Sequence, residues 1–270
     1  MSAATTDEAR ASLLAPLLED PAASAVLTDI DGTLAPIVDD PSAASVPEGA
    51  RAALAELSGR YAIVGCISVR RAQEARELVG VEGIAYAGNH GLELLLPGDE
   101  KPTPDPSLAG REEGAAAFLD ALGDEALAGG GLRREDKGPI QALHWRGADD
   151  ERGAEARARE IAAQAGRDGL DPHWGRKVLE LRPAGGGGKE AAVGALLAPE
   201  PVSRAVYAGD DRTDLDAFRR LRELQETGKL DTSVCVGVSS DEGPGELAEE
   251  ADLTVDGPAG WLALLRTLAG

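Results

Sequence analysis

Short apolar runs alternate with amphipathic segments along most of this chain of 270 residues, and the alternation restricts the folds open to it. Strands that alternate with helices form a parallel sheet, because each right-handed crossover brings the next strand back into the same sheet. The sequence therefore predicts an α/β fold with a doubly wound, mostly parallel-sheet core. The expected buried strands are 25–28, 61–68, 84–87, 205–208 and 233–238, and the expected helices between or before them are 7–20, 48–57, 73–79 and 215–224.

The middle of the chain differs from the rest in its amino-acid composition. Residues 97–106 are rich in Pro, Gly and charge, which is typical of a linker, and a four-glycine run stands at 185–188. We therefore expect an α+β domain, residues 106–183, inserted into a core made of 1–105 and 184–270, with a ligand site between the two lobes. The expected elements of the insertion are helices 115–122 and 155–165 and extended segments 141–145 and 178–181.

Composition narrows the classes of partner. The formal net charge of −21 argues against nucleic acid and anionic membrane surfaces but is compatible with a bound metal ion. Cys66 and Cys235 lie in apolar runs, so we expect buried thiols and a reducing compartment. No signal-like segment opens the chain and no run of 18 apolar residues occurs, so a cytoplasmic location is expected.

Two aspartates, Asp29 and Asp31, follow the first apolar run and precede Gly32. Alternate residues of a strand point to the same side, so both carboxylates start near one spot at a strand's carboxyl end, where open α/β sheets bind ligands. Close carboxylates repel each other unless a cation or a proton lies between them. The pair therefore indicates either a hard metal ion or an acid/base couple.

Three further polar segments end expected strands or open expected helices. A hydroxyl donor, a lysine and a carboxylate cluster at one sheet edge indicate a phosphate site with a divalent cation, in which a carboxylate can attack phosphorus. The residues are Ser68 with Arg70, Lys189, and the cluster Asp210, Asp211 and Asp214.

These four segments, in this order, are similar to the four motifs of the haloacid dehalogenase superfamily. The resemblance implies that Asp29 is the nucleophile, and that Asp31 protonates the leaving alkoxide and then activates water. It further implies that Ser68 and Lys189 bind the transferring phosphoryl group and that Arg70 contacts the substrate. The implied Mg²⁺ ligands are Asp29, the backbone carbonyl of Asp31, and Asp210, with Asp211 or Asp214 completing the shell directly or through water.

Five segments look like the trehalose-6-phosphate phosphatase family: 88–93, 135–137, 144–146, 180–183 and 209–214. The resemblance implies that the insertion is a cap that closes over a sugar phosphate and excludes water. Glu135, Lys137 and Glu180 would then hydrogen-bond glucose hydroxyls, with His90 reaching from the core. It also implies functional coupling to a trehalose-6-phosphate synthase.

Alternatives stay open at this point. The core motifs would serve sucrose 6-phosphate or a glycosylglycerate phosphate equally well. Val69 stands where the family usually has glycine, and valine tolerates positive φ poorly, so the approach of the phosphate could be impaired. A non-catalytic sugar-phosphate sensor is therefore a second class of function. A phosphorelay receiver is a third, disfavoured by the paired aspartates, the late acidic cluster and the insertion.

Overall fold

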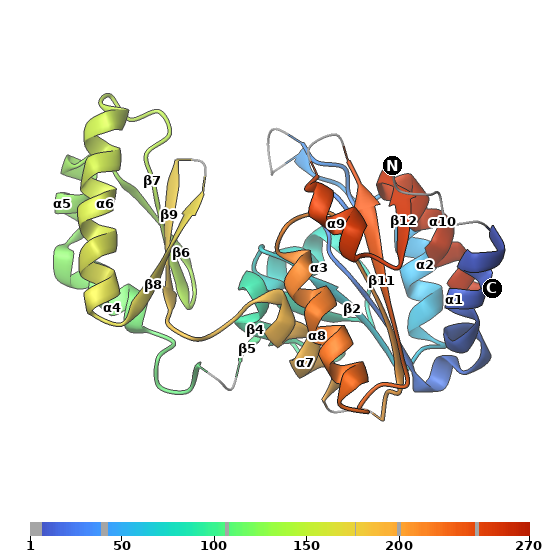
Figure 1. The fold of residues 1–270 in the computed structure, drawn as a ribbon. Helices are drawn as coiled ribbons and strands as arrows, with labels where there is room; N and C mark the ends of the chain where they lie inside the picture. Colours follow the sequence, from blue (N-terminus) through green and yellow to red (C-terminus); the bar gives the residue numbers. More distant parts are fainter. Residues whose placement is uncertain (1–6, 39–42, 106–107, 176, 199–200, 241–242) are drawn as a thin grey trace. The chain divides into compact units, whose positions relative to one another are not determined.

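A computed structural model of the chain describes residues 7–38, 43–105, 108–175, 177–198, 201–240 and 243–270. Two compact units emerge: a core unit formed by Met1–Thr103 with Gly187–Gly270, and an inserted unit, Pro104–Gly186. Most of their elements are labelled in Figure 1. The expected boundary between residues 105 and 106 falls next to residues 106 and 107, which lie outside the described residues.

The core unit contains an eight-stranded sheet in the order β12-β11-β10-β1-β2-β3-β4-β5. The strands from β12 to β3 are parallel, and β4 runs antiparallel to β3. This confirms the predicted doubly wound α/β fold class. The strands are β1 (Ser24–Thr28), β2 (Ile63–Ile67), β3 (Ala85–Gly88), β4 (Glu93–Leu95), β5 (Thr103–Pro104), β10 (Arg204–Gly209), β11 (Thr232–Ser239) and β12 (Leu253–Asp256).

Helices cover both faces of this sheet because its central strands are apolar on both sides. Val26 of β1 packs into one cluster, whereas its neighbours Ala25 and Leu27 pack into the other. The first cluster is covered by α1 (Asp7–Glu19), α2 (Glu48–Ser58), α3 (Ala72–Val79) and α10 (Gly257–Ala269), and the second by α7 (Lys189–Leu197), α8 (Asp214–Glu226) and α9 (Gly245–Glu250) (Figure 1).

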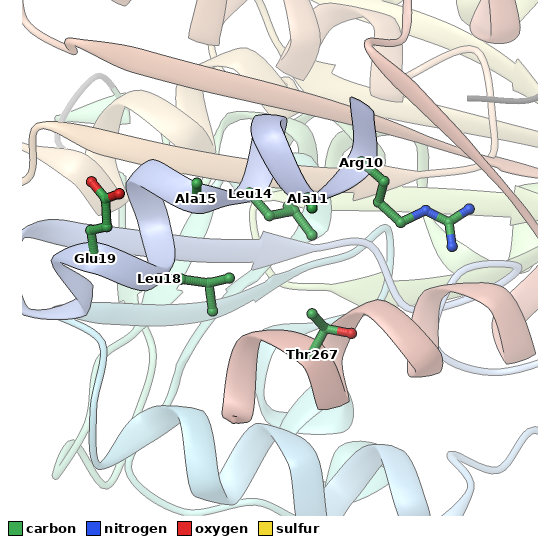
Figure 2. A pocket seen from close by; sticks show the side chains of 7 residues that line it. All are labelled: Arg10, Ala11, Leu14, Ala15, Leu18, Glu19 and Thr267. Carbon is green, nitrogen blue, oxygen red and sulfur yellow. The ribbon is translucent and has the colours of Figure 1, made fainter. Parts of the chain in front are cut away.

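Helix α1 borders a hollow of about 360 Å³ that Thr267 of α10 closes on the other side (Figure 2). Its lining is mostly apolar and includes none of the predicted site residues. Both cysteines are buried free thiols, as predicted. Burial raises the pKa of Cys66 and raises that of Cys235 to about 12, so neither forms a thiolate readily. Within the described ranges, no helix has the length and apolar character that crossing a membrane requires.

The inserted unit is an antiparallel sheet in the order β6-β7-β9-β8 with helices packed on one face (Figure 1). Strand β9 alternates between buried and half-buried residues, as expected when only one face is packed against helices. Strand β8 is missed by the apolar pattern, because Asp171, Pro172 and His173 interrupt it. The elements are α4 (Gly114–Leu122), α5 (Asp124–Gly129), β6 (Arg133–Lys137), β7 (Ile140–His144), α6 (Glu151–Arg167), β8 (Leu170–Gly175) and β9 (Val178–Pro183).

Candidate active site

The carboxyl edge of the core sheet brings together the polar segments that follow its strands. Asp29 directly follows β1, and its amide donates to the Ala208 carbonyl of β10 at 2.8 Å. Gly32 then turns the chain with φ 96°, and a Cβ at that position would lie 2.0 Å from Asp210 Oδ2. Only glycine therefore lets the Asp210 carboxylate approach the turn that follows Asp29. Thr33 Oγ1 donates to Asp210 Oδ1 at 3.0 Å and fixes this approach.

Lys189, the first residue of α7, lies at the centre of the cluster and is 1% exposed. Its Nζ donates to Asp29 Oδ1 at 2.9 Å and to Asp214 Oδ1 at 2.6 Å, and it lies 3.6 Å from Asp211 Oδ1. Burial would lower the pKa of Lys189, but attraction to Asp29 and Asp214 outweighs burial and raises it. The lysine therefore stays charged.

One lysine does not neutralise this many carboxylates. Burial, together with repulsion from Asp214 and Asp210, raises the pKa of Asp29 despite the pull of Lys189. Burial and repulsion from Asp214 likewise raise the pKa of Asp210 to about 6. Ligand oxygens of Asp29, Asp210 and Asp214 lie within 4.8 Å of one another. A set of hard oxygen donors with surplus negative charge is the type of site that fits Mg²⁺.

Within this cluster, Asp214 is already fully engaged by protein donors. Its Oδ1 accepts from Lys189 and, at 2.5 Å, from the Tyr207 hydroxyl. Its Oδ2 accepts from the amides of Asp210 and Asp211, both at 2.9 Å. Asp214 is fully buried, so these bonds fix the 210–211 turn and the lysine in one arrangement.

Asp211 is different, because its side chain is half exposed. Its Oδ1 accepts from the amide of Thr213 at 2.8 Å and from the Thr213 hydroxyl at 2.6 Å. Burial acts to raise the pKa of Asp211, but Lys189 and these hydrogen bonds outweigh it and lower the pKa. Asp211 is therefore the member of the cluster that stays ionised while facing solvent.

Asp31 and Arg70 form a two-pronged ion pair. Arg70 Nε donates to Asp31 Oδ2 at 2.8 Å, and Nη2 donates to Asp31 Oδ1 at 2.7 Å. The Arg70 amide donates to Ser68 Oγ at 3.1 Å, and Ser68 is 1% exposed. The Arg70 guanidinium, which we expect to contact substrate, thus hydrogen-bonds Asp31, the predicted acid/base residue, and orients its carboxylate.

The loop that carries Val69 has no need of a glycine backbone. Among the described non-glycine residues, those with positive φ are Asn89, His90 and Lys177, and Val69 is not one of them. The strain anticipated for Val69 is therefore absent, and its side chain is 40% exposed. His90, expected to reach toward the sugar, lies half-buried in a left-handed turn.

In the inserted unit, the predicted sugar-binding residues share the sheet face opposite the helices. Glu135 faces Ala142, which faces Glu180, so the two glutamates point to the same side. Lys137 Nζ donates to Glu180 Oε1 at 3.1 Å, and Arg182 Nη2 donates to Glu180 Oε2 at 2.6 Å. Burial acts to raise the pKa of Glu180, but the two cations lower it to about 2.

A second pair lies on the same face. His144 Nε2 lies 2.6 Å from Glu135 Oε2, so each glutamate of this face has a nitrogen partner. The sequence prediction did not include His144 or Arg182 among the site residues, although Arg182 alternates with the predicted Glu180 along β9. We name this set the polar face; it consists of Glu135, Lys137, His144, Glu180 and Arg182.

Three polar residues of the core unit also escaped prediction. Tyr207 and Thr33 bind the aspartates through hydroxyls, and buried Glu93 binds the start of α3. For Tyr207, a hydroxyl inside an apolar strand two residues before Gly209-Asp210 was an available signal. For Glu93, a charge opening an apolar strand was a comparable one.

A doubly wound sheet with this cluster at its carboxyl edge and an inserted α+β unit defines the class of haloacid dehalogenase-like folds. A haloacid dehalogenase-like hydrolase from Bacteroides thetaiotaomicron has the same fold, with a TM-score of 0.63 over 91% of this chain and 99% of that one at 11% identity. The chain belongs to the trehalose-phosphatase family, whose model matches residues 27–258. The resemblance inferred from the sequence is therefore confirmed.

Two relatives show the extent of the similarity. A trehalose-phosphate phosphatase of Mycobacterium marinum is 38% identical over 202 residues, which are 72% of this chain and 50% of that protein. The C-terminal domain of Candida albicans trehalose-6-phosphate phosphatase has a TM-score of 0.72 at 22% identity, over 99% of this chain and 98% of that one. The chain thus spans about half the length of the curated trehalose-phosphate phosphatases it matches, but nearly the whole of this structural neighbour.

Proposed function

We propose that this protein is a Mg²⁺-dependent phosphatase that hydrolyses trehalose 6-phosphate to trehalose and phosphate. The observation that carries the proposal is the buried Asp29–Lys189–Asp214 cluster at the sheet edge, in a chain of the trehalose-phosphatase family. A buried lysine suits a phosphoryl group, and an excess of carboxylates suits a divalent cation.

The carboxylates of Asp29 and Asp210, with the backbone carbonyl of Asp31, would hold Mg²⁺. The bound cation would supply positive charge that offsets the cluster and draws electron density from the phosphoryl group. Asp211, ionised and half exposed, would complete the shell directly or through water. Because both Asp214 oxygens already accept two hydrogen bonds, we assign Asp214 to holding Lys189 and the 210–211 turn.

Catalysis would begin with attack of an Asp29 carboxylate oxygen on phosphorus, forming an aspartyl-phosphate as the bond from phosphorus to the sugar oxygen breaks. Asp31 would give its proton to the leaving sugar alkoxide and then take one from the water that hydrolyses the aspartyl-phosphate. Lys189 and Ser68 would hold the phosphoryl oxygens. To carry a proton, Asp31 would give up at least one of its two hydrogen bonds from Arg70, so the bidentate contact would hold Asp31 only while its carboxylate is ionised.

For the sugar, we propose that Glu135, Lys137 and Glu180 bind hydroxyls through the polar face. Half-buried charged groups with fixed partners present donors and acceptors in set directions, which suits a polyhydroxylated ligand. His90 stays a predicted sugar contact. Coupling to a trehalose-6-phosphate synthase also remains a prediction that follows from the substrate.

The decisive measurement is phosphate release from a panel of sugar phosphates, with and without Mg²⁺. We expect trehalose 6-phosphate to be preferred, Mg²⁺ to be required, and Asp29→Asn to lower kcat by at least about 10³-fold. Preference for sucrose 6-phosphate or a glycosylglycerate phosphate would refute the substrate assignment. Turnover by Asp29→Asn at the normal rate would refute the nucleophile, and binding without release would favour the sensor.

The polar face has its own test. We expect Glu180→Ala to raise KM for trehalose 6-phosphate about tenfold or more while leaving KM for p-nitrophenyl phosphate nearly unchanged, because only the disaccharide has hydroxyls to lose. Glu155→Ala is the matched control, since Glu155 pairs with Arg159 on α6 and lies outside the polar face. Equal effects of Glu180→Ala on both substrates would contradict a sugar-binding role.

A further inference from the structure

A buried carboxylate outside the catalytic cluster anchors the loop that carries Ser68 and Arg70. Glu93, the first residue of β4, is 6% exposed, and its Oε1 accepts from the Ala72 amide at 2.6 Å. Ala72 is the first residue of α3, and Arg71 before it makes no capping hydrogen bond with its side chain. Glu93, although it lies on β4, therefore caps the N-terminus of α3 in place of a local side chain and adds a negative charge there.

The turn between β3 and β4 attaches to the Ser68 loop as well. The Asn89 amide donates to the Arg70 carbonyl at 2.7 Å, and the His90 amide donates to the Ser68 carbonyl at 3.1 Å. Both residues adopt left-handed backbones, with φ of 51° and 58°, and Asn89 also hydrogen-bonds Glu93 through its side chain. Strain of this kind persists only where the surroundings impose it, and here it directs two successive amides at one loop.

The same turn also holds the start of α7. The Gly188 amide, next to Lys189, donates to the His90 carbonyl at 2.5 Å. A Cβ on Gly91 would lie 2.8 Å from the Gly188 carbonyl oxygen, and one on Gly88 would lie 2.0 Å from the Ala72 nitrogen. The turn is thus in close contact with α3 on one side and α7 on the other, and glycine is required at both contacts.

We propose that Glu93 is a positioning residue for phosphate binding: through α3 and the 88–91 turn, it sets the spacing between the Ser68 hydroxyl and the Lys189 ammonium. The proposal rests on the phosphatase function proposed above, because it gives those two groups the same phosphoryl ligand. Glu93 itself is bound to the α3 amide and to Asn89 and needs no contact with the substrate. Loss of its carboxylate would free the start of α3 and let the Ser68 loop shift relative to Lys189.

The test measures phosphate affinity separately from sugar affinity. We expect Glu93→Ala to raise the inhibition constant of inorganic phosphate about tenfold, and to raise KM for trehalose 6-phosphate and for p-nitrophenyl phosphate by that same factor. Glu93→Gln keeps an acceptor oxygen for the Ala72 amide and should stay within about threefold of the wild type. Glu74→Gln, an exposed carboxylate in the first turn of the same helix, should leave all three constants unchanged.

A folded Glu93→Ala protein with unchanged phosphate inhibition would overturn the proposal and leave Glu93 a purely structural cap. If Glu93→Ala does not fold, Glu93→Asp tests the proposal, because aspartate keeps the negative charge but its shorter side chain draws the carboxylate away from the Ala72 amide. The aspartate variant should weaken phosphate binding several-fold, and wild-type affinity in it would overturn the proposal. The affinity for inorganic phosphate can also be measured by calorimetry in the presence of Mg²⁺, without any turnover. If the wild type hydrolyses no sugar phosphate, the proposed function is refuted. The role of Glu93 is then still decided by whether Glu93→Ala weakens phosphate binding.

Discussion

The two units each hold a cluster of charged side chains, and the two clusters differ in their balance of charge. In the core unit, several buried carboxylates surround one lysine, and the pKa values of Asp29 and Asp210 are raised by burial and by mutual repulsion. In the inserted unit, Glu180 lies between Lys137 and Arg182, and these cations lower its pKa to about 2 although burial acts in the other direction.

The difference indicates what each cluster is suited to bind. A buried site with surplus negative charge is stabilised by a bound cation. The polar face is already compensated, so it gains little from a charged ligand but offers oriented donors and acceptors to neutral hydroxyls. Solvent access differs too, with Lys189 1% exposed and the Lys137 side chain 23% exposed. Equivalent substitutions should therefore have unequal effects on stability.

The largest contrast is expected between two lysines. Lys189→Met leaves Asp29 and Asp214 buried without their cation, which should lower the free energy of unfolding by roughly 3–5 kcal/mol and abolish phosphate release. Lys137→Met removes one of two cations from the partly hydrated Glu180 and should cost about 0.5–1 kcal/mol. Urea unfolding of both variants in Mg²⁺-free buffer measures the difference. Similar losses of unfolding free energy in Lys189→Met and Lys137→Met would contradict the distinction between a buried cluster and a solvent-screened one.

Much of the core cluster was predictable because its residues follow a simple rule of topology. Asp29, Ser68 and Asp210 each come directly after a parallel strand, and Lys189 opens a helix behind the sheet. Parallel strands place all their carboxyl ends at one edge, so adjacency in space follows from position along the chain. The polar face has no comparable rule. Resemblance to a family identified Glu135, Lys137 and Glu180, whereas His144 and Arg182 were not predicted.

What could not be predicted depends on pairings between distant side chains. Arg70 was expected on the substrate, but its guanidinium binds Asp31, 39 residues away in the sequence. Glu93 caps a helix that begins 21 residues earlier, which no local pattern of capping residues can reveal. The glycine missing at Val69 suggested a defect, yet the backbone there avoids positive φ, which sequence alone does not report.

A smaller effect is expected from metal binding, and it should depend on pH. At pH 7 and a Mg²⁺ concentration 100 times its Kd, the fold should gain about 2.7 kcal/mol. Near pH 5 the gain should shrink, because Asp210, with a pKa raised to about 6, is then largely protonated and Mg²⁺ has to displace the proton. Thermal unfolding with Mg²⁺ and with EDTA at both pH values measures this gain, and Asp210→Asn is the control that should lose most of it. A shift in Tm that is independent of pH, or retained in Asp210→Asn, would contradict the proposed ligand set.

The smallest effect concerns Glu180, whose pKa is shifted in the opposite direction to that of Asp210. The pKa of Glu180 is about 2 in the folded protein against an ordinary 4.5, so its ion pairs stabilise the fold fully above about pH 4.5 and progressively less as the pH falls toward 2. Glu180→Gln should therefore be less stable than the wild type by about 1–2 kcal/mol at pH 7, and the gap should narrow at pH 3. Glu155→Gln, which breaks a more exposed ion pair on α6, should cost no more than about 0.5 kcal/mol at pH 7. A gap between wild type and Glu180→Gln that stays constant with pH would mean that packing, and not charge, holds Glu180 in the polar face.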